Sequence, residues 1–132
     1  MRGLDTNVLV RYLVADDVQQ TALAVKLVEQ SRRAGNSLYI STVVLCEVVW
    51  VLTRSYGQAK AEIIRILELI LRTEQFLIER DPIVRHSLDA FRSGRADFAN
   101  YVIGEICREA GCEDCVTFDR GLNGAVGFTL LR

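Results

Sequence analysis

Short apolar runs alternate along this sequence with longer segments of helical periodicity, and that alternation limits the folds open to the chain. The apolar runs predict a strand ending at Leu4 and further strands at 37–41, 76–79, 115–118 and 128–131. The segments between them predict helices at about 7–14, 18–34, 42–56, 58–73, from 81 onward, and at 97–110. Strands separated by helices are typical of a parallel sheet covered on both faces, so the sequence predicts an α/β fold.

The size of the chain favours one domain. It has 132 residues, of which 50% are apolar, enough for one core, and its single proline, Pro82, marks no linker. We therefore expect residues 1–132 to form a single domain. The longest apolar stretch, VVLCEVVWVL, is interrupted by Glu47 and is too short to span a bilayer. No membrane association is predicted, the cytoplasm is the expected location, and the four cysteines are expected to be thiols.

Two aspartates follow predicted strands. Asp5 comes directly after Leu4, and Asp119 comes directly after the run CVTF. In open parallel sheets ligands bind beyond the carboxyl ends of the strands, so both carboxylates are candidates for one site. The competing interpretation is helix capping, because aspartate is a favoured N-cap.

Glu47 is the least expected acid in the sequence. Its neighbours in the predicted helix, Val43 to Val51, are almost all apolar, and no Lys or Arg lies three or four residues away. A lone buried charge would be costly, which predicts a partner in space. That partner is either a site or a distant arginine such as Arg11 or Arg95.

The segment GRADFANYVIG adds a third candidate region. Asp97 opens a predicted helix, and Asn100 lies one turn later on the same face. Asp97 alone would be an ordinary N-terminal helix acid. Together with Asp5, Glu47 and Asp119 it would form a carboxylate cluster, which repels itself unless a cation is bound, and all-oxygen ligation favours Mg²⁺ or Mn²⁺.

Four segments stand in this order along the chain: LDTNVLVRYL, STVVLCEVVWVL, ADFANYVIG and CEDCVTFDRGL. In sequence, order and spacing they resemble the PIN-domain ribonucleases, and within them the VapC-type toxins of toxin–antitoxin pairs. The resemblance covers nearly the whole chain. It implies a three-layer α/β/α fold with a central parallel sheet and an acidic site for one or two Mg²⁺ or Mn²⁺ ions that cuts single-stranded or loop RNA.

The resemblance also implies roles for individual residues. Asp5, Glu47, Asp97 and Asp119 look like the carboxylates of the site, with Asp5, Asp97 and Asp119 as metal ligands. Thr6, Asn7 and Thr117 look like supporting polar groups. In such a site the metal activates water for in-line attack on a phosphodiester, and the products carry a 5′ phosphate. With His86 as the one histidine, a metal-free histidine pair is excluded.

Asn100 departs from the family pattern, which often has a second aspartate at this position. Asn100 keeps an oxygen but loses the charge. Asn100 is either natural variation, with Asp97 acting as the acid of this segment, or a substitution that lowers the activity of a toxic nuclease. Because of Asn100, the alternative to an endoribonuclease is a PIN domain that binds RNA or protein without cleaving it. Aspartyl-phosphate phosphatases and phospho-receiver domains do not fit, because Asn7 stands where the former need a second Asp and Asp16 and Asp17 follow the first helix.

The remaining features concern partners. The net charge of −1 provides no overall attraction for RNA, so local arginines, Arg11, Arg95 and Arg120, are the candidate phosphate contacts, unless they are solvated or ion-paired. Cys112 and Cys115 form a CxxC pair, which we expect to pack beside the strand rather than to bind zinc. Excess apolar surface around Trp50 and over 63–71 is either buried or an interface. The family resemblance implies a homodimer and an inhibitory antitoxin.

Overall fold

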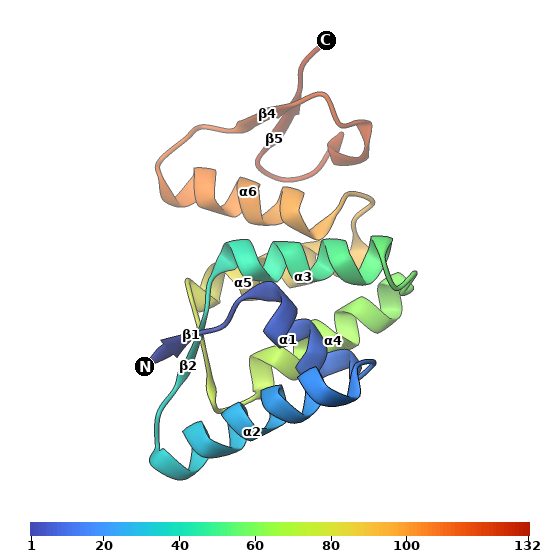
Figure 1. Ribbon diagram of the computed structural model, residues 1–132. Coiled ribbons are helices and arrows are strands. Elements are labelled where there is room, and N and C mark those ends of the chain that lie inside the picture. Colours follow the sequence, from blue (N-terminus) through green and yellow to red (C-terminus); the bar gives the residue numbers. More distant parts are fainter. The chain divides into compact units, whose positions relative to one another are not determined.

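The computed structural model describes residues 1–132 and divides into two compact units, Met1–Glu79 and Arg80–Arg132, each of which is described by itself (Figure 1). The elements of the first unit are β1 (Arg2–Gly3), α1 (Thr6–Val14), α2 (Val18–Ala34), β2 (Leu38–Ile40), α3 (Thr42–Arg54), α4 (Lys60–Arg72) and β3 (Phe76–Ile78). Those of the second are α5 (Asp81–Ser93), α6 (Phe98–Glu109), β4 (Cys115–Thr117), the 3-10 helix η1 (Arg120–Leu122) and β5 (Phe128–Leu130).

The first unit contains a three-stranded parallel sheet with the order β1-β2-β3. Leu38 pairs with Arg2 on one side and with Phe76 on the other. Because all three strands run in the same direction, their carboxyl ends lie at one edge. Asp5 follows β1 at this edge, and Glu79 follows β3.

The core of the first unit comes from strand and helix positions with the expected periodicity. Leu38 and Ile40 of β2 are fully buried, as alternate residues of one strand face the same side. Helix α4 buries the stripe Ile63, Ile66, Leu67 and Ile70, while Leu69 is 40% exposed. The excess apolar surface predicted over 63–71 is therefore mostly core.

The second unit is built on the helix pair α5 and α6 with a two-stranded parallel sheet, β4-β5. Phe91 of α5 meets Phe98 of α6 edge-on, with ring centroids 6.0 Å apart. Phe128 of β5 contacts Tyr101 of α6 in the same manner at 6.5 Å. Gly104 allows this approach, because a Cβ there would lie 2.5 Å from the Phe128 ring. This packing places β5 against α6, and β5 in turn pairs with β4, which Asp119 follows.

The prediction of an α/β fold with parallel strands flanked by helices is confirmed, and every predicted helix and strand is present within a few residues. One detail differs. Helix α3 ends at Arg54 instead of continuing to Tyr56. In α2, Ala24 and Val28 are buried while Val25 is 42% exposed. That the whole chain is one domain stays a prediction. None of the helices combines the length and hydropathy needed to cross a bilayer.

Candidate functional site

Asp5 caps the first helix. Its backbone is extended at the N-cap of α1, and Asp5 Oδ1 accepts a hydrogen bond of 2.8 Å from Thr6 N. The capping interpretation is therefore confirmed, but it occupies one oxygen of a carboxylate that is exposed. A capping bond and a ligand role are compatible, since the second oxygen, Oδ2, makes no hydrogen bond within the protein.

Glu47 is exposed, so the expectation of a lone buried charge is wrong. The run of apolar residues in α3 suggested burial on all sides, but some of these residues are at the surface. Val43 is 67% exposed and Trp50 is 60% exposed. Arg11 is not the partner of Glu47. Its guanidinium lies 3.2 Å from Asp16 and also donates to Tyr56.

The partner of Glu47 is Thr6. Thr6 Oγ1 donates a hydrogen bond of 3.1 Å to Glu47 Oε1, and the same threonine donates its backbone N–H to Asp5. Thr6 is 6% exposed. One buried residue thus bonds two exposed carboxylates that lie 42 positions apart, and it connects the start of α1 to the second turn of α3.

Asp119 is held by three bonds in the second unit. Asp119 Oδ1 accepts from Gly121 N at 2.8 Å and caps η1, and Asp119 N donates to Thr117 Oγ1 at 3.0 Å. Asp119 Oδ2 accepts from Asn100 Nδ2 at 3.1 Å. The capping interpretation is confirmed here too, and Asn100 acts as a donor to the acid.

Asp97 is the N-cap residue of α6, but its side chain makes no capping bond. Its carboxylate is exposed. The preceding loop is fixed instead by Tyr101, whose hydroxyl oxygen accepts from Ala96 N at 3.2 Å. Gly94 leaves room for that hydroxyl, since a Cβ there would lie 1.8 Å from it. Asp97 is therefore an acid on a fixed loop whose oxygens have no structural task.

The donor set of both units suits a hard cation. Asp5 and Glu47 in the first unit, and Asp97, Asn100 and Asp119 in the second, offer only oxygen ligands, the type that Mg²⁺ and Mn²⁺ prefer. Within neither unit do three or more His, Cys, Asp or Glu side chains come close enough to hold a metal ion together. Each unit contains two of these carboxylates, Asp5 and Glu47 in the first and Asp97 and Asp119 in the second.

Comparison with known proteins agrees with these motifs. The PIN domain family matches residues 4–126. The chain belongs to the PIN domain family. It is also similar to a protein named VapC ribonuclease from Aquifex aeolicus (strain VF5), with 24% identity over 120 residues, which cover 91% of this chain and 88% of that protein. The resemblance identified from the sequence is confirmed.

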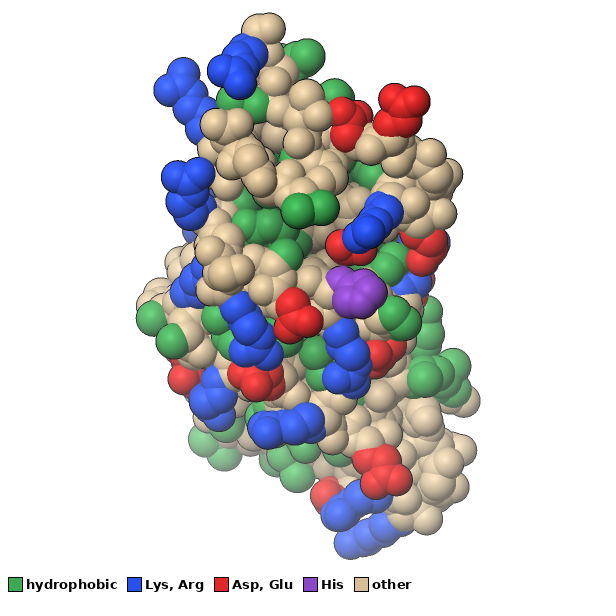
Figure 2. All heavy atoms as spheres, turned by 180° about the vertical axis from the view of Figure 1, so that it is seen from behind, with side chains coloured by type: hydrophobic (Ala, Val, Ile, Leu, Met, Phe, Trp, Pro, Cys, Tyr) green, Lys and Arg blue, Asp and Glu red, His purple; other side chains and the backbone are tan.

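Basic groups of this PIN domain are dispersed. On the face drawn in Figure 2, Lys and Arg side chains are interspersed with Asp and Glu, and no field of one sign covers it. Arg11 is engaged with Asp16 and Tyr56, so the ion-paired interpretation holds for it. Arg95 and Arg120 are exposed and make no ion pair within their unit. Asn7 is exposed and its side chain makes no hydrogen bond, unlike that of Thr6 beside it.

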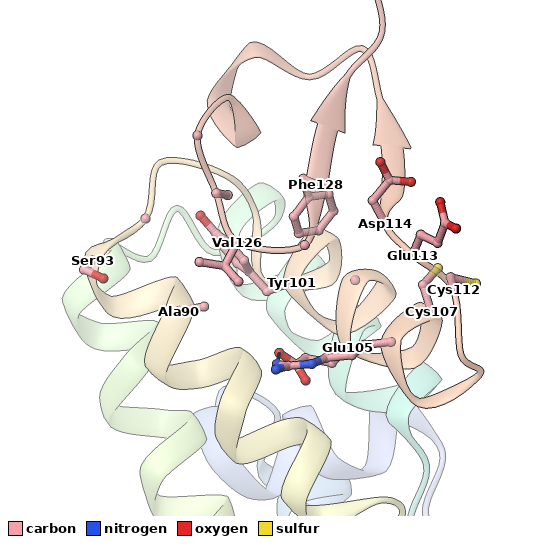
Figure 3. Close-up of a pocket in the computed structure, with 16 residues that line it drawn as sticks. Ala90, Ser93, Tyr101, Glu105, Cys107, Cys112, Glu113, Asp114, Val126 and Phe128 are labelled. Carbon is pink, nitrogen blue, oxygen red and sulfur yellow. Dashed lines mark ion pairs between the residues drawn. The ribbon is translucent and has the colours of Figure 1, made fainter.

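One cavity in the second unit contains none of the predicted site residues. It has a volume of about 660 Å³, and Glu105, Cys107, Cys112 and Asp114 line it (Figure 3). Figure 3 shows the sulfur atoms of Cys107 and Cys112 next to each other. Hydrogen bonding to Cys115, with a smaller contribution from burial, raises the pKa of the Cys107 thiol. All four cysteines are free, and Cys107 lies beside both members of the CxxC pair, which their spacing in the sequence did not indicate.

Two residues that hold segments next to candidate site residues were not identified from the sequence. Glu79 Oε1 accepts from both the backbone N–H and the hydroxyl of Thr42, at 2.9 Å each, and so holds the start of α3, which carries Glu47. Its position after β3 was a usable signal, the same one that marked Asp5. Tyr101, which fixes the loop before Asp97, had none, because its bond depends on how the chain turns at Gly94.

Proposed function

We propose that the chain is a Mg²⁺- or Mn²⁺-dependent endoribonuclease and the toxin of a toxin–antitoxin pair. The observation that carries the proposal is the link Asp5–Thr6–Glu47. The backbone N–H and the hydroxyl of the buried Thr6 orient two exposed carboxylates. A capping role for Asp5 does not require that the hydroxyl of Thr6 also bonds Glu47. The name of the relative, VapC ribonuclease, supports RNA as the substrate.

Each site residue has a proposed task. Asp5, Asp97 and Asp119 hold the metal, Glu47 orients the attacking water, and Thr6 and Thr117 keep carboxylates in place. The bound metal supplies an activated water and neutralises charge on the phosphodiester. The match to the PIN domain family covers the segments that carry both sets of acids.

Asn100 is proposed to take part through Asp119. Its amide donates to Asp119 Oδ2 and so stabilises the negative charge of that carboxylate. An aspartate at position 100 would instead add a second negative charge. The Asn100 oxygen remains available to a metal or to a metal-bound water. The expected consequence is a weaker metal site than one with aspartate at this position.

The test is cleavage of structured RNA by purified, antitoxin-free protein with Mg²⁺ or Mn²⁺ and with EDTA. Asp17 provides a matched control for Asp5, because it caps α2 through Gln20 N as Asp5 caps α1, and no carboxylate partner contacts it. We expect Asp5→Asn to lower metal-dependent cleavage by about 10²- to 10⁴-fold, the equivalent of several kcal/mol of lost charge stabilisation. Asp17→Asn should cleave as the wild type does. Equal activity of the two variants would contradict the proposal.

The second candidate function is a non-cleaving PIN domain that binds RNA or protein. The hydrogen bond between Asn100 and Asp119 favours it, because it satisfies the acid without a metal. RNA binding without metal-dependent turnover, together with cleavage only by Asn100→Asp, would identify this state. Cleavage by the wild type would exclude it.

Partners and location complete the proposal. We expect a homodimer, an antitoxin that covers the acidic site, and action in the cytoplasm. The exposed Val43 and Trp50 on the helix that carries Glu47 support a protein-covered surface near the site. Light scattering at micromolar concentration tests the expected dimer, and a monomeric mass would contradict it.

A further inference from the structure

A second cavity lies in the second unit next to Asp119. It has a volume of about 400 Å³ and is lined by Phe118, Arg120, Asn123, Leu130, Leu131 and Arg132. Phe118 and Arg120 are the residues directly before and after Asp119. The carboxylate of Asp119 is turned to Gly121 and Asn100, and its two neighbours line the cavity.

Phe118 is unusual among the aromatic residues of this unit. Phe91, Phe98, Tyr101 and Phe128 pack in ring pairs, whereas the Phe118 side chain is 78% exposed and has no ring partner. A single exposed apolar residue is ordinary. Here the ring lies on the wall of a cavity with an amide and cationic groups, and that combination indicates a ligand.

The charge of this cavity separates it from the larger one. No acidic side chain lines it, and Arg120 and Arg132 do. The larger cavity is lined by Glu105, Glu113 and Asp114 against one arginine, Arg108. In a chain of net charge −1, a polyanion is attracted only where basic groups gather, so the smaller cavity is the suitable one.

We propose that Phe118, Arg120 and Asn123 form a subsite for one unpaired nucleotide of single-stranded RNA. The base stacks on the Phe118 ring, Arg120 contacts its phosphate, and the Asn123 amide hydrogen-bonds an edge of the base. The inference rests on the proposed function, since it places this nucleotide beside the phosphodiester held at Asp119. Successive Cα atoms are about 3.8 Å apart, so ring, acid and guanidinium lie within the reach of one nucleotide step.

Binding is measured with a fluorescein-labelled single-stranded RNA oligonucleotide by anisotropy, in EDTA to prevent cleavage. Stacking on an aromatic ring predicts a Kd raised about 5- to 150-fold in Phe118→Ala. Phe118→Trp should restore binding, and Phe118→Leu, which is apolar without a π face, should not. Arg120→Ala should reduce the dependence of log K on log salt by about 0.7. Val126→Ala is the control, as Val126 is 90% exposed in the same unit but lines the other cavity.

A parallel cleavage assay separates this inference from the proposed function. If the wild type cleaves RNA with metal and the Kd of Phe118→Ala is unchanged, the subsite proposal is overturned and the proposed nuclease function is retained. Binding that depends on Phe118 without any cleavage supports the subsite and overturns the nuclease. A wild type that binds no single-stranded RNA, or a Phe118→Leu variant that binds as well as Phe118→Trp, overturns the subsite.

Discussion

The acids of the first unit and those of the second are held in different ways. In the first unit, Asp5 and Glu47 both bond Thr6, which is buried, so two carboxylates share one fixed donor residue. In the second, Asp119 is fixed by its own turn and by Asn100, and Asp97 has no side-chain bond. The first pair is placed by tertiary packing of α1 on α3, and the second group by local turns.

This difference suggests a division of tasks. A carboxylate oriented by a buried neighbour keeps its geometry without a metal, which suits the placement of a water molecule. An acid on a turn with free oxygens can adjust to a ligand. We therefore expect changes at Thr6 to affect turnover, and changes at Asn100 to affect metal affinity.

Among the changes that test this contrast between the units, the largest effect is expected for Thr6→Val, which removes the hydroxyl but keeps the shape of the side chain. Loss of an outer-shell partner typically costs about 10- to 100-fold in activity or metal affinity. Because the backbone N–H still bonds Asp5, we expect kcat for RNA cleavage to fall with little change in KM. Steady-state kinetics measures this.

Thr6→Ser is the control for that change. It keeps the donor and should restore kcat. If Thr6→Val lowers the free energy of unfolding as much as it lowers activity, and Thr6→Ser does not restore kcat, the residue is structural and the contrast between the units fails.

Tyr101→Phe tests the second unit. It removes the acceptor of the buried Ala96 N–H, and an unsatisfied buried donor costs about 1–3 kcal/mol. The loop that carries Asp97 should loosen, and Mn²⁺ affinity should fall together with stability. Denaturant unfolding and Mn²⁺ titration of the same variant measure both. An unchanged Mn²⁺ affinity in a destabilised variant would show that Asp97 does not depend on this loop.

Asn100→Asp should lower the Tm without metal and raise it with metal. It replaces the amide that donates to Asp119 with a second carboxylate, and two unit charges about 4 Å apart in water repel by about 1 kcal/mol. In EDTA we expect Tm to fall by roughly 3–5 °C, and with saturating Mn²⁺ we expect it to rise above that of the wild type. A fall of equal size under both conditions would contradict a metal role for this position.

The sequence predicted nearly all elements of the fold because their signals are local. Apolar periodicity, the Ser41 cap and Gly35 at the end of α2 define helices without any tertiary contact. The two aspartates at strand ends were identified for the same reason, since the direction of a parallel strand fixes where its carboxyl end lies.

The details of the site depend on packing and were less predictable. Glu47 was interpreted as buried because periodicity cannot tell which part of an apolar helix is left uncovered, and Val43 and Trp50 are exposed beside it. The bond from Thr6 to Glu47 joins residues 41 positions apart. Capping and site roles were treated as alternatives, although a carboxylate has two oxygens and Asp5 caps α1 with one of them.

The smallest effect is expected for Tyr56→Phe, which tests whether α1 and α3 are placed by Thr6 alone. Arg11 of α1 and Asp16 both bond the hydroxyl of Tyr56, which follows α3, so the two helices are also connected away from the site. The hydrogen bond from Tyr56 is the main reason that the pKa of Asp16 is lowered. A lowered pKa in the folded state means that the stabilisation is present above the ordinary carboxyl pKa and lost as the pH falls through the lowered one.

Removing the hydroxyl should return the pKa of Asp16 toward its ordinary value, which NMR titration of the Asp16 carboxyl carbon measures. The groups are exposed, so the loss of stability should be small at pH 7 and should vanish in acid. A stability difference that persists unchanged in acid would show that Tyr56 acts without Asp16. In the double variant Thr6→Val, Tyr56→Phe, a fall in kcat beyond the sum of the two single changes would mean that both connections between α1 and α3 position Glu47, and not Thr6 alone.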